Sequence, residues 1–274
     1  GPLLSTPRAA TATPSPDPPM TDAAQPSPDA SSSVDPVDLA RFTRLGDDWW
    51  APEGPMKPLH RMNPPRVGWI RDALCARFDR DPKARRPLAG LTILDVGCGG
   101  GILCEPLARL GADVTGVDPG AENIGAARAH AARMGLTIDY RATTVEALGA
   151  EPGRFDAVLA MEVVEHVVEP GPFLAAAAAL VKPGGLMFAS TLNRNLKSWA
   201  MAIVGAEYLL RWLPKGTHDW NKFLTPDELA ALLTEAGLDV EGRAGVIYDP
   251  LADRFRLSSR DLDVNYMLVA KKVA

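Results

Sequence analysis

A glycine-rich stretch between two short apolar segments constrains the fold of this chain more than any other feature. The apolar segment 91–96 runs into Gly97-Cys98-Gly99-Gly100-Gly101, and a second apolar segment ends at Asp118, about twenty residues after the first glycine. Glycines let backbone N–H groups approach a ligand closely, and a carboxylate at the end of the second strand can accept both hydroxyls of a ribose. The pattern predicts a βαβ unit that binds an adenosine-containing ligand.

The residue ahead of the glycines distinguishes between adenosine ligands. Asp95 is the first residue of the motif Asp-x-Gly-x-Gly-Gly-Gly, which differs from the Gly-x-Gly-x-x-Gly motif of dinucleotide sites. A carboxylate at this place would repel a pyrophosphate, but it suits the ammonium of a methionine moiety. The sequence therefore favours S-adenosylmethionine over NAD, with Asp95, Gly97, Gly99 and Asp118 as expected contacts.

Charge and cysteine content exclude several classes of function. The formal net charge is −5 at pH 7 and Lys and Arg form no run, so nucleic-acid binding has no electrostatic basis. The cysteines Cys75, Cys98 and Cys104 form no Cys-x-x-Cys pair, so we expect reduced thiols in a cytosolic setting rather than disulfides or a zinc site. No stretch approaches the ~20 apolar residues of a membrane span, and no signal-peptide pattern is present.

Residues 1–37 differ in composition from the rest of the chain. They are rich in Pro, Ala, Ser and Thr and have too few large apolar side chains to build a core, which predicts a disordered tail without function. Gly1-Pro2 is typical of a remnant of tag cleavage, and we expect Met20 to be the natural start. An organellar presequence would rest on one basic residue, Arg8, and has little support.

Apolar segments alternate with helical patterns through the rest of the chain. Apolar residues recur at helical spacing from Asp38, and a proline-rich loop then leads to a helix with Asn63 as N-cap and Pro64 in its first turn. A turn at 182–185 precedes the fifth strand. Strands are predicted at residues 91–96, 113–117, 137–141, 155–160, 186–190, 240–247 and 264–270, and the clearest later helices at 121–134, 172–180 and after Thr225.

This order predicts an α/β fold with one catalytic domain over residues 38–274. Strands that alternate with helices, followed by a final strand pair, are typical of an open doubly wound sheet. We expect a mostly parallel, seven-stranded, Rossmann-like sheet with an N-terminal helical extension and a helical insertion, residues 194–220, after the fifth strand.

Two carboxylates and an imidazole follow the fourth predicted strand. Glu162 and Glu165 are three positions apart and would share one face of a helical turn, with His166 beside them. Ligands of such sheets bind outside the carboxyl ends of the strands, so these side chains are expected at the cofactor cleft. They suit either a hard divalent cation or a general base, and polar residues that merely begin a helix are the alternative.

Other histidines and the insertion leave alternatives open. His60 and His218 lie in predicted loops that reach the same face, as substrate contacts or as surface residues, whereas His130 is expected to be structural. Residues 196–213 are strongly apolar, with tryptophans and flanking basic residues. This pattern fits binding to a membrane surface, and equally a lid helix packed on the core.

Together these motifs resemble the UbiG-like ubiquinone-biosynthesis O-methyltransferases, which methylate ring hydroxyls of polyprenylated intermediates. The resemblance covers about residues 42–271, and the glycine motif alone would indicate only a class I methyltransferase. The segments that carry it are Trp49-Trp50 and residues 57–64, 94–103, 161–166, 190–195, 204–208, 214–218 and 263–266.

The resemblance implies specific site residues and partners. It implies S-adenosylmethionine contacts at Arg66, Gly97, Asp118 and Met161, and a divalent metal, Mg²⁺, as a cofactor. It also implies that residues 196–213 meet anionic membrane lipids and that the enzyme works beside other ubiquinone-biosynthesis proteins. The expected location is the cytoplasm, peripherally on the inner membrane, or the mitochondrial matrix side in a eukaryote. The metal ligands that it implies are Glu162, Glu165 and His166.

The expected reaction is an in-line attack of a catechol oxygen on the sulfonium methyl. A phenol with a pKa of ~10 must lose its proton, either with the help of a bound metal or directly to His166 or Glu165 as the catalytic base. The alternatives are methylation of another lipophilic phenol, or a non-catalytic S-adenosylmethionine-binding assembly subunit at the membrane. The second alternative would have no use for Glu162, Glu165 and His166 at the methyl group.

Overall fold

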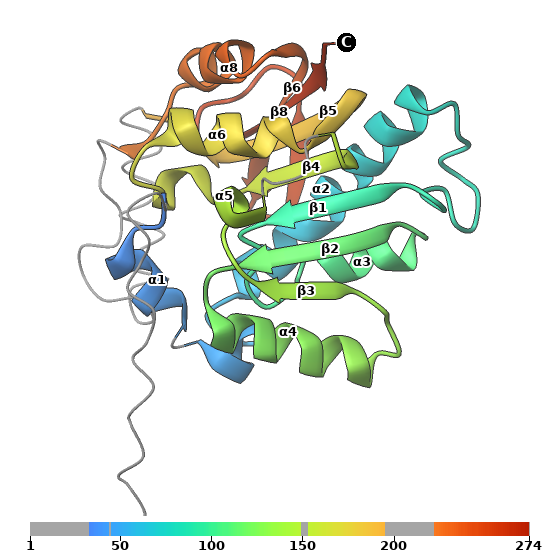
Figure 1. The fold of residues 1–274 in the computed structure, drawn as a ribbon. Helices are drawn as coiled ribbons and strands as arrows, with labels where there is room; N and C mark the ends of the chain where they lie inside the picture. The colour runs from blue at the N-terminus through green and yellow to red at the C-terminus, as the bar shows by residue number, and fades with distance from the viewer. Residues whose placement is uncertain (1–32, 44, 149–152, 195–221, 274) are drawn as a thin grey trace, which may run out of the picture. The chain divides into compact units, whose positions relative to one another are not determined.

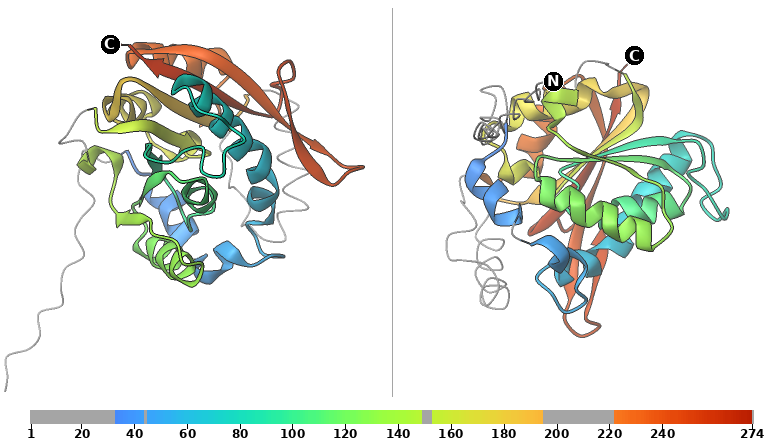
Figure 2. Two further views of the ribbon diagram at one scale, coloured as in Figure 1. Left: turned by 90° about the vertical axis from the view of Figure 1, so that its right-hand side faces the viewer. Right: turned by 60° about the horizontal axis from the view of Figure 1, so that its bottom comes forward.

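One mixed sheet of eight strands organises the part of the chain that the computed structural model describes, residues 33–43, 45–148, 153–194 and 222–273. Its strand order is β3-β2-β1-β4-β5-β8-β6-β7, with helices on both faces (Figures 1 and 2). The strands are β1 (Thr92–Val96), β2 (Asp113–Asp118), β3 (Asp139–Ala142), β4 (Phe155–Met161), β5 (Val181–Leu192), β6 (Leu238–Asp249), β7 (Arg254–Ser258) and β8 (Asn265–Lys272).

The direction of the strands confirms the predicted doubly wound architecture. Strands β3, β2, β1, β4 and β5 are parallel, β8 is antiparallel to β5, and β6 is antiparallel to both β8 and β7. The predicted count of seven strands is wrong, because β7 extends the edge beside β6. The missed strand has the alternating pattern Arg254, Phe255, Arg256, Leu257, in which only one face is apolar.

Two apolar cores lie on opposite faces of the sheet. In β1, Ile93 packs in one core and Leu94 in the other, and both are fully buried. A strand that is buried on both faces reads as a continuous apolar run, which explains why segment 91–96 stood out in the sequence. The helices and short helical turns are α1 (Pro36–Thr43), η1 (Gly46–Trp50), α2 (Lys57–Arg77), α3 (Cys104–Arg109), α4 (Ala121–Arg133), α5 (Val145–Leu148), η2 (Val164–His166), α6 (Pro170–Ala179) and α8 (Pro226–Glu235).

The N-terminal helix α2 begins earlier than the sequence suggested. It starts at Lys57, because Pro58 occupies the first turn, where the missing N–H costs nothing. Asn63 is therefore not an N-cap, and its Nδ2 donates to the carbonyl of Ile102 at 2.7 Å instead. The predicted turn before the fifth strand at 182–185 is wrong, because these residues lie inside β5. They form an irregularity in the pairing with β4, where Phe155 pairs with Val181 and Ala157 with Leu186.

Described structure is already present inside the predicted tail of residues 1–37. Val34 forms an isolated antiparallel bridge with Val167, and Val168 N–H donates to the carbonyl of Ser33 at 2.9 Å. Helix α1 then starts at Pro36, with the Asp35 carboxylate accepting from Val37 N–H at 3.0 Å in the manner of an N-cap. Residues 1–32 of the predicted tail, and 195–220 of the predicted insertion, lie outside the described residues.

None of the described helices combines the length and the apolar character that a membrane crossing requires.

Candidate active site

A cavity of about 360 Å³ opens at the carboxyl ends of β1, β2 and β4. This is the edge at which parallel sheets bind their ligands. One wall consists of the glycine loop after β1, a second of the segment after β4, and a third of the N-terminal residues 33–62. The predicted site residues that line it are Arg66, Asp95, Gly97, Gly99, Asp118, Met161, Glu162, Glu165 and His166.

The glycine loop needs glycines for two reasons that the structure makes visible. Gly97 and Gly99 have φ angles of +70° and +52°, in the left-handed region that favours glycine. A Cβ on Gly99 would also lie 2.4 Å from the ring of Trp49. The close neighbour of the loop is thus a tryptophan of the chain itself, whereas the sequence interpretation considered only a ligand.

The Asp118 carboxylate lies at the end of β2 and ties three donors together. It accepts from the N–H groups of Gly99 and Gly120 at 3.0 and 2.8 Å and from Asn123 Nδ2 at 3.1 Å. Burial raises the pKa of this carboxyl, while these hydrogen bonds act in the opposite direction. A carboxylate offers about four acceptor positions, so room remains for a ribose hydroxyl at the cavity.

Arg66 brings a buried positive charge to the cavity. Its side chain is 2% exposed, and its Nε has no hydrogen-bond partner within the described ranges. Burial lowers the pKa of Arg66, and the charges of Glu162, Asp95 and Glu165 counteract that effect. Burial likewise raises the pKa of Asp95 to about 7. An unused guanidinium donor beside a carboxylate suits the carboxylate and ammonium of a methionine moiety, so these residues fit S-adenosylmethionine.

Glu162 and Glu165 do not share a helical face as predicted. Glu162 lies outside η2 with φ at +55°, an uncommon conformation for a residue with a side chain. Its Oε1 accepts from Ser190 Oγ at 2.8 Å and from Asn265 Nδ2 at 3.0 Å. Glu165 instead accepts from Thr191 Oγ1 at 2.8 Å through Oε2. The two carboxylates therefore bond to different side chains of β5 and β8.

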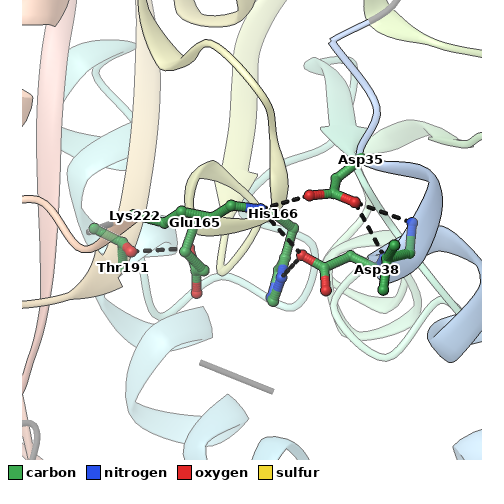
Figure 3. A network of polar contacts seen from close by, with 7 residues as sticks. Asp35, Asp38, Glu165, His166, Thr191 and Lys222 are labelled. Carbon is green, nitrogen blue, oxygen red and sulfur yellow. Dashed lines mark hydrogen bonds and ion pairs between the residues drawn. The ribbon is translucent and has the colours of Figure 1, made fainter. Parts of the chain in front are cut away.

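His166 belongs to a polar network that joins α1 to the segment after β4 (Figure 3). Its Nδ1 lies 3.1 Å from Asp38 Oδ2, and Asp38 in turn lies 3.9 Å from Lys222 Nζ, which also contacts Asp35. Burial lowers the pKa of His166, but the hydrogen bond with Asp38 and the charge of Glu165 outweigh it and raise that pKa. Burial and the charge of Glu162 raise the pKa of Glu165 to about 7.

The arrangement of these three side chains does not fit the metal that the resemblance implies. Oxygens of Glu162 and Glu165 accept from protein hydroxyls, and His166 Nδ1 faces Asp38. No group of three His, Cys, Asp or Glu side chains is placed to hold a metal ion in the part of the chain that the structure describes. Because the described side chains are not gathered as a metal-ligand group, no step of the reaction is assigned to a metal.

The other predicted histidines have different places. His60 lies in α2, not in a loop, and its Nε2 is 2.8 Å from the carbonyl oxygen of Trp49; it does not line the cavity. His130 lies 2.6 Å from Glu105, away from the cavity. His218 and the apolar segment 196–213 fall outside the described residues.

Sequence reasoning missed Asp38 and Lys222 as members of the site. Asp38 meets His166 across 128 positions of sequence, and no local pattern encodes that contact. Thr191 and Asn265 were part of recognisable motifs, but their role as donors to Glu165 and Glu162 follows only from the strand register.

Comparison with known proteins places this chain among methyltransferases. A model of a methyltransferase domain matches residues 68–242. A ubiquinone biosynthesis O-methyltransferase of Bradyrhizobium sp. (strain ORS 278) is 57% identical over 242 residues, 88% of this chain and 95% of that protein. One of Rhodopseudomonas palustris (strain BisB18) is 57% identical over 249 residues, 90% of this chain and 97% of that protein.

Solved structures support the fold. A magnesium protoporphyrin IX methyltransferase from Synechocystis PCC 6803 with bound S-adenosylhomocysteine has a TM-score of 0.60 at 19% identity, covering 86% of this chain and 98% of that one. At this identity the likeness shows the fold, while the curated relatives show the family. The chain belongs to the ubiquinone biosynthesis O-methyltransferases, within the S-adenosylmethionine-dependent methyltransferases.

Proposed function

We propose that this chain methylates a ring hydroxyl of a polyprenylated catechol or demethylubiquinol. S-adenosylmethionine-dependent O-methylation in ubiquinone biosynthesis is the activity of its family. The observation that carries the proposal is the common cavity: Arg66 and Asp118, suited to the two ends of the methyl donor, face the same space as His166. A shared cavity supports a displacement in which donor and proton acceptor act on the same substrate oxygen.

We infer that His166 takes the phenolic proton. If Nδ1–H of His166 donates to Asp38, the lone pair of the neutral imidazole is on Nε2, and a phenol can transfer its proton there. The resulting phenolate oxygen bonds to the sulfonium methyl as the methyl–sulfur bond breaks, and S-adenosylhomocysteine is the leaving group. The charges of Asp38 and Glu165 stabilise the imidazolium that forms. Phenolate and sulfonium neutralise each other in the transition state, so an apolar surrounding favours the step.

The test is transfer of a labelled methyl group from S-adenosylmethionine to a short-chain prenylated catechol, with Mg²⁺ and again with EDTA. Transfer that survives EDTA supports His166 as the base. Transfer that EDTA abolishes and Mg²⁺ restores would replace that role with metal ligation by Glu162, Glu165 and His166. If the catechol is inert while another lipophilic phenol reacts, the substrate proposed is wrong. If no phenol reacts while S-adenosylmethionine binds, the assembly-subunit alternative holds.

We further propose that residues 196–213 bring the enzyme to an anionic membrane surface on the cytoplasmic side, where a polyprenylated substrate resides. The support is the sequence: tryptophans and basic residues border an apolar stretch. Co-sedimentation with anionic liposomes tests it, using Trp199→Glu combined with Leu210→Glu. We expect the double variant to lose lipid binding, and full retention in a folded variant would refute the proposal.

A further inference from the structure

Two aromatic rings outside the cavity are stacked against each other beside the glycine loop. The rings of Trp50, in η1, and His130, in α4, have centroids 3.6 Å apart and planes inclined by 2°. The indole Nε1 donates to the carbonyl oxygen of Gly100 at 2.8 Å. The imidazole therefore supports one face of an indole whose edge holds the peptide of Gly100.

The imidazole is itself fixed by a buried carboxylate. Nδ1 of His130 lies 2.6 Å from Glu105 Oε1, and Arg109 Nη2 donates to Oε2 of the same residue at 2.9 Å. Glu105 is fully buried and stands in the first turn of α3, the helix that follows the glycine loop. A buried carboxylate with two such partners holds its neighbours in one geometry, since losing either partner leaves one buried oxygen without a hydrogen bond.

The adjacent tryptophan reaches the other end of the cofactor site. Nε1 of Trp49 donates to Asn123 Oδ1 at 3.0 Å, and Asn123 donates to Asp118. The ring of Trp49 lies so close to Gly99 and Gly100 that a Cβ on either glycine would clash with it. Two consecutive indoles thus connect η1 to both the glycine loop and the ribose-side carboxylate.

We propose that Trp50, His130 and Glu105 are positioning residues for S-adenosylmethionine. None of the three is among the described residues that line the cavity, so each acts through the glycine loop and not on the ligand. The chain of contacts Glu105–His130–Trp50–Gly100 fixes the peptide of Gly100 and with it the direction of the neighbouring N–H groups. The inference rests on cofactor binding at this loop and is independent of the methyl acceptor.

Calorimetric titration of the full chain with S-adenosylhomocysteine tests the proposal without any acceptor. We expect His130→Ala and Trp50→Phe each to raise the Kd by about tenfold, the scale of one lost hydrogen bond or ring contact. Arg133→Ala, an exposed residue on the same helix, is the matched control and should leave the Kd unchanged. Both variants interrupt the same chain of contacts to Gly100. The Kd of the double variant should therefore rise by less than the product of the two single increases.

A separation of kinetic constants distinguishes positioning from a general structural role. The KM for S-adenosylmethionine should rise in His130→Ala, while kcat at saturating cofactor and the KM for the acceptor stay near the wild-type values. An unchanged Kd in both variants, or an equal fall of every constant together with the melting temperature, would overturn the proposal. Should His130→Ala fail to fold, Trp50→Phe, which keeps an aromatic ring against His130, decides the question by the same criteria.

Discussion

Asp38 Oδ2 lies 3.1 Å from Nδ1 of His166, although the two residues are 128 positions apart in the sequence. The contact makes helix α1 a part of the site, because it brings a carboxylate from the N-terminal segment to the imidazole after β4 (Figure 3). Lys222, much later in the sequence, lies 3.9 Å from the same carboxylate through its Nζ. Three distant parts of the chain therefore meet at the group that we propose as the base.

Replacement of Asp38 by Asn should change the pH dependence of methyl transfer. Asp38 raises the pKa of His166, so its loss lowers that pKa. The neutral imidazole needed as a base then persists to lower pH, and the acidic limb of the rate profile should move to lower pH. We also expect kcat to fall by about tenfold, because the imidazolium loses a stabilising charge. An unshifted limb would show that His166 does not set the profile.

The same pair should make stability depend on pH within a defined window. Asp38 has its pKa lowered from an ordinary 3.8, so its contribution is present above that pH and is lost as pH falls through the folded value. His166 has its pKa raised from an ordinary 6.5, so its contribution is complete below that pH and is lost as pH rises through the folded value. Urea unfolding should show the largest wild-type advantage over Asp38→Asn between these two pH values. An equal difference at every pH would contradict the ion pair.

Glu165→Gln should separate chemistry from cofactor binding. The side chain keeps its size and can still accept from Thr191, but it loses the charge that supports a protonated His166. We expect kcat to fall by about 100-fold, within the range for acid–base groups, with little change in the Kd for S-adenosylhomocysteine. A methyl-transfer assay measures kcat, and calorimetric titration measures the Kd. A parallel loss of both would indicate that Glu165 acts on the fold of the site.

The parts of the site that depend on local geometry were predictable, and those that depend on tertiary contacts were not. Gly97 and Asp118 could be identified because a strand–glycine–helix unit encodes its own turn and spacing. The parallel strands stood out since burial on both faces demands continuous apolar runs. In contrast, Asp38 lies in an ordinary amphipathic helix, and only the assembled fold brings it to His166. The packing of Trp49 on Gly99 is hidden from sequence for the same reason.

Asp118→Ala should abolish tight cofactor binding and also destabilise the fold. The change leaves the N–H groups of Gly99 and Gly120 and the amide of Asn123 without their acceptor. Buried donors that lose a partner cost about 1–3 kcal/mol in the free energy of unfolding. Urea unfolding and titration with S-adenosylhomocysteine measure the two losses. Asp113→Ala, at the exposed start of the same strand, is the control and should change neither.

A pair of glycine substitutions should have opposite effects on stability. Gly99→Ala places a Cβ at a positive φ and against the ring of Trp49, so we expect a loss of about 1–3 kcal/mol in the free energy of unfolding and weaker cofactor binding. Gly125→Ala lies inside α4 with no heavy atom within 4 Å of the added Cβ. Alanine is the better helix former there, so the fold should gain up to about 1 kcal/mol.

Chemical denaturation of the two variants beside the wild type measures these effects under one set of conditions. The comparison isolates the glycine loop, since the same methyl group is added to both positions and only the backbone and the neighbour at Gly99 differ. If Gly99→Ala were as stable as Gly125→Ala and bound S-adenosylhomocysteine normally, the close approach of Trp49 to Gly99 would not constrain the loop. The contact of η1 with the cofactor site would then be dispensable for binding.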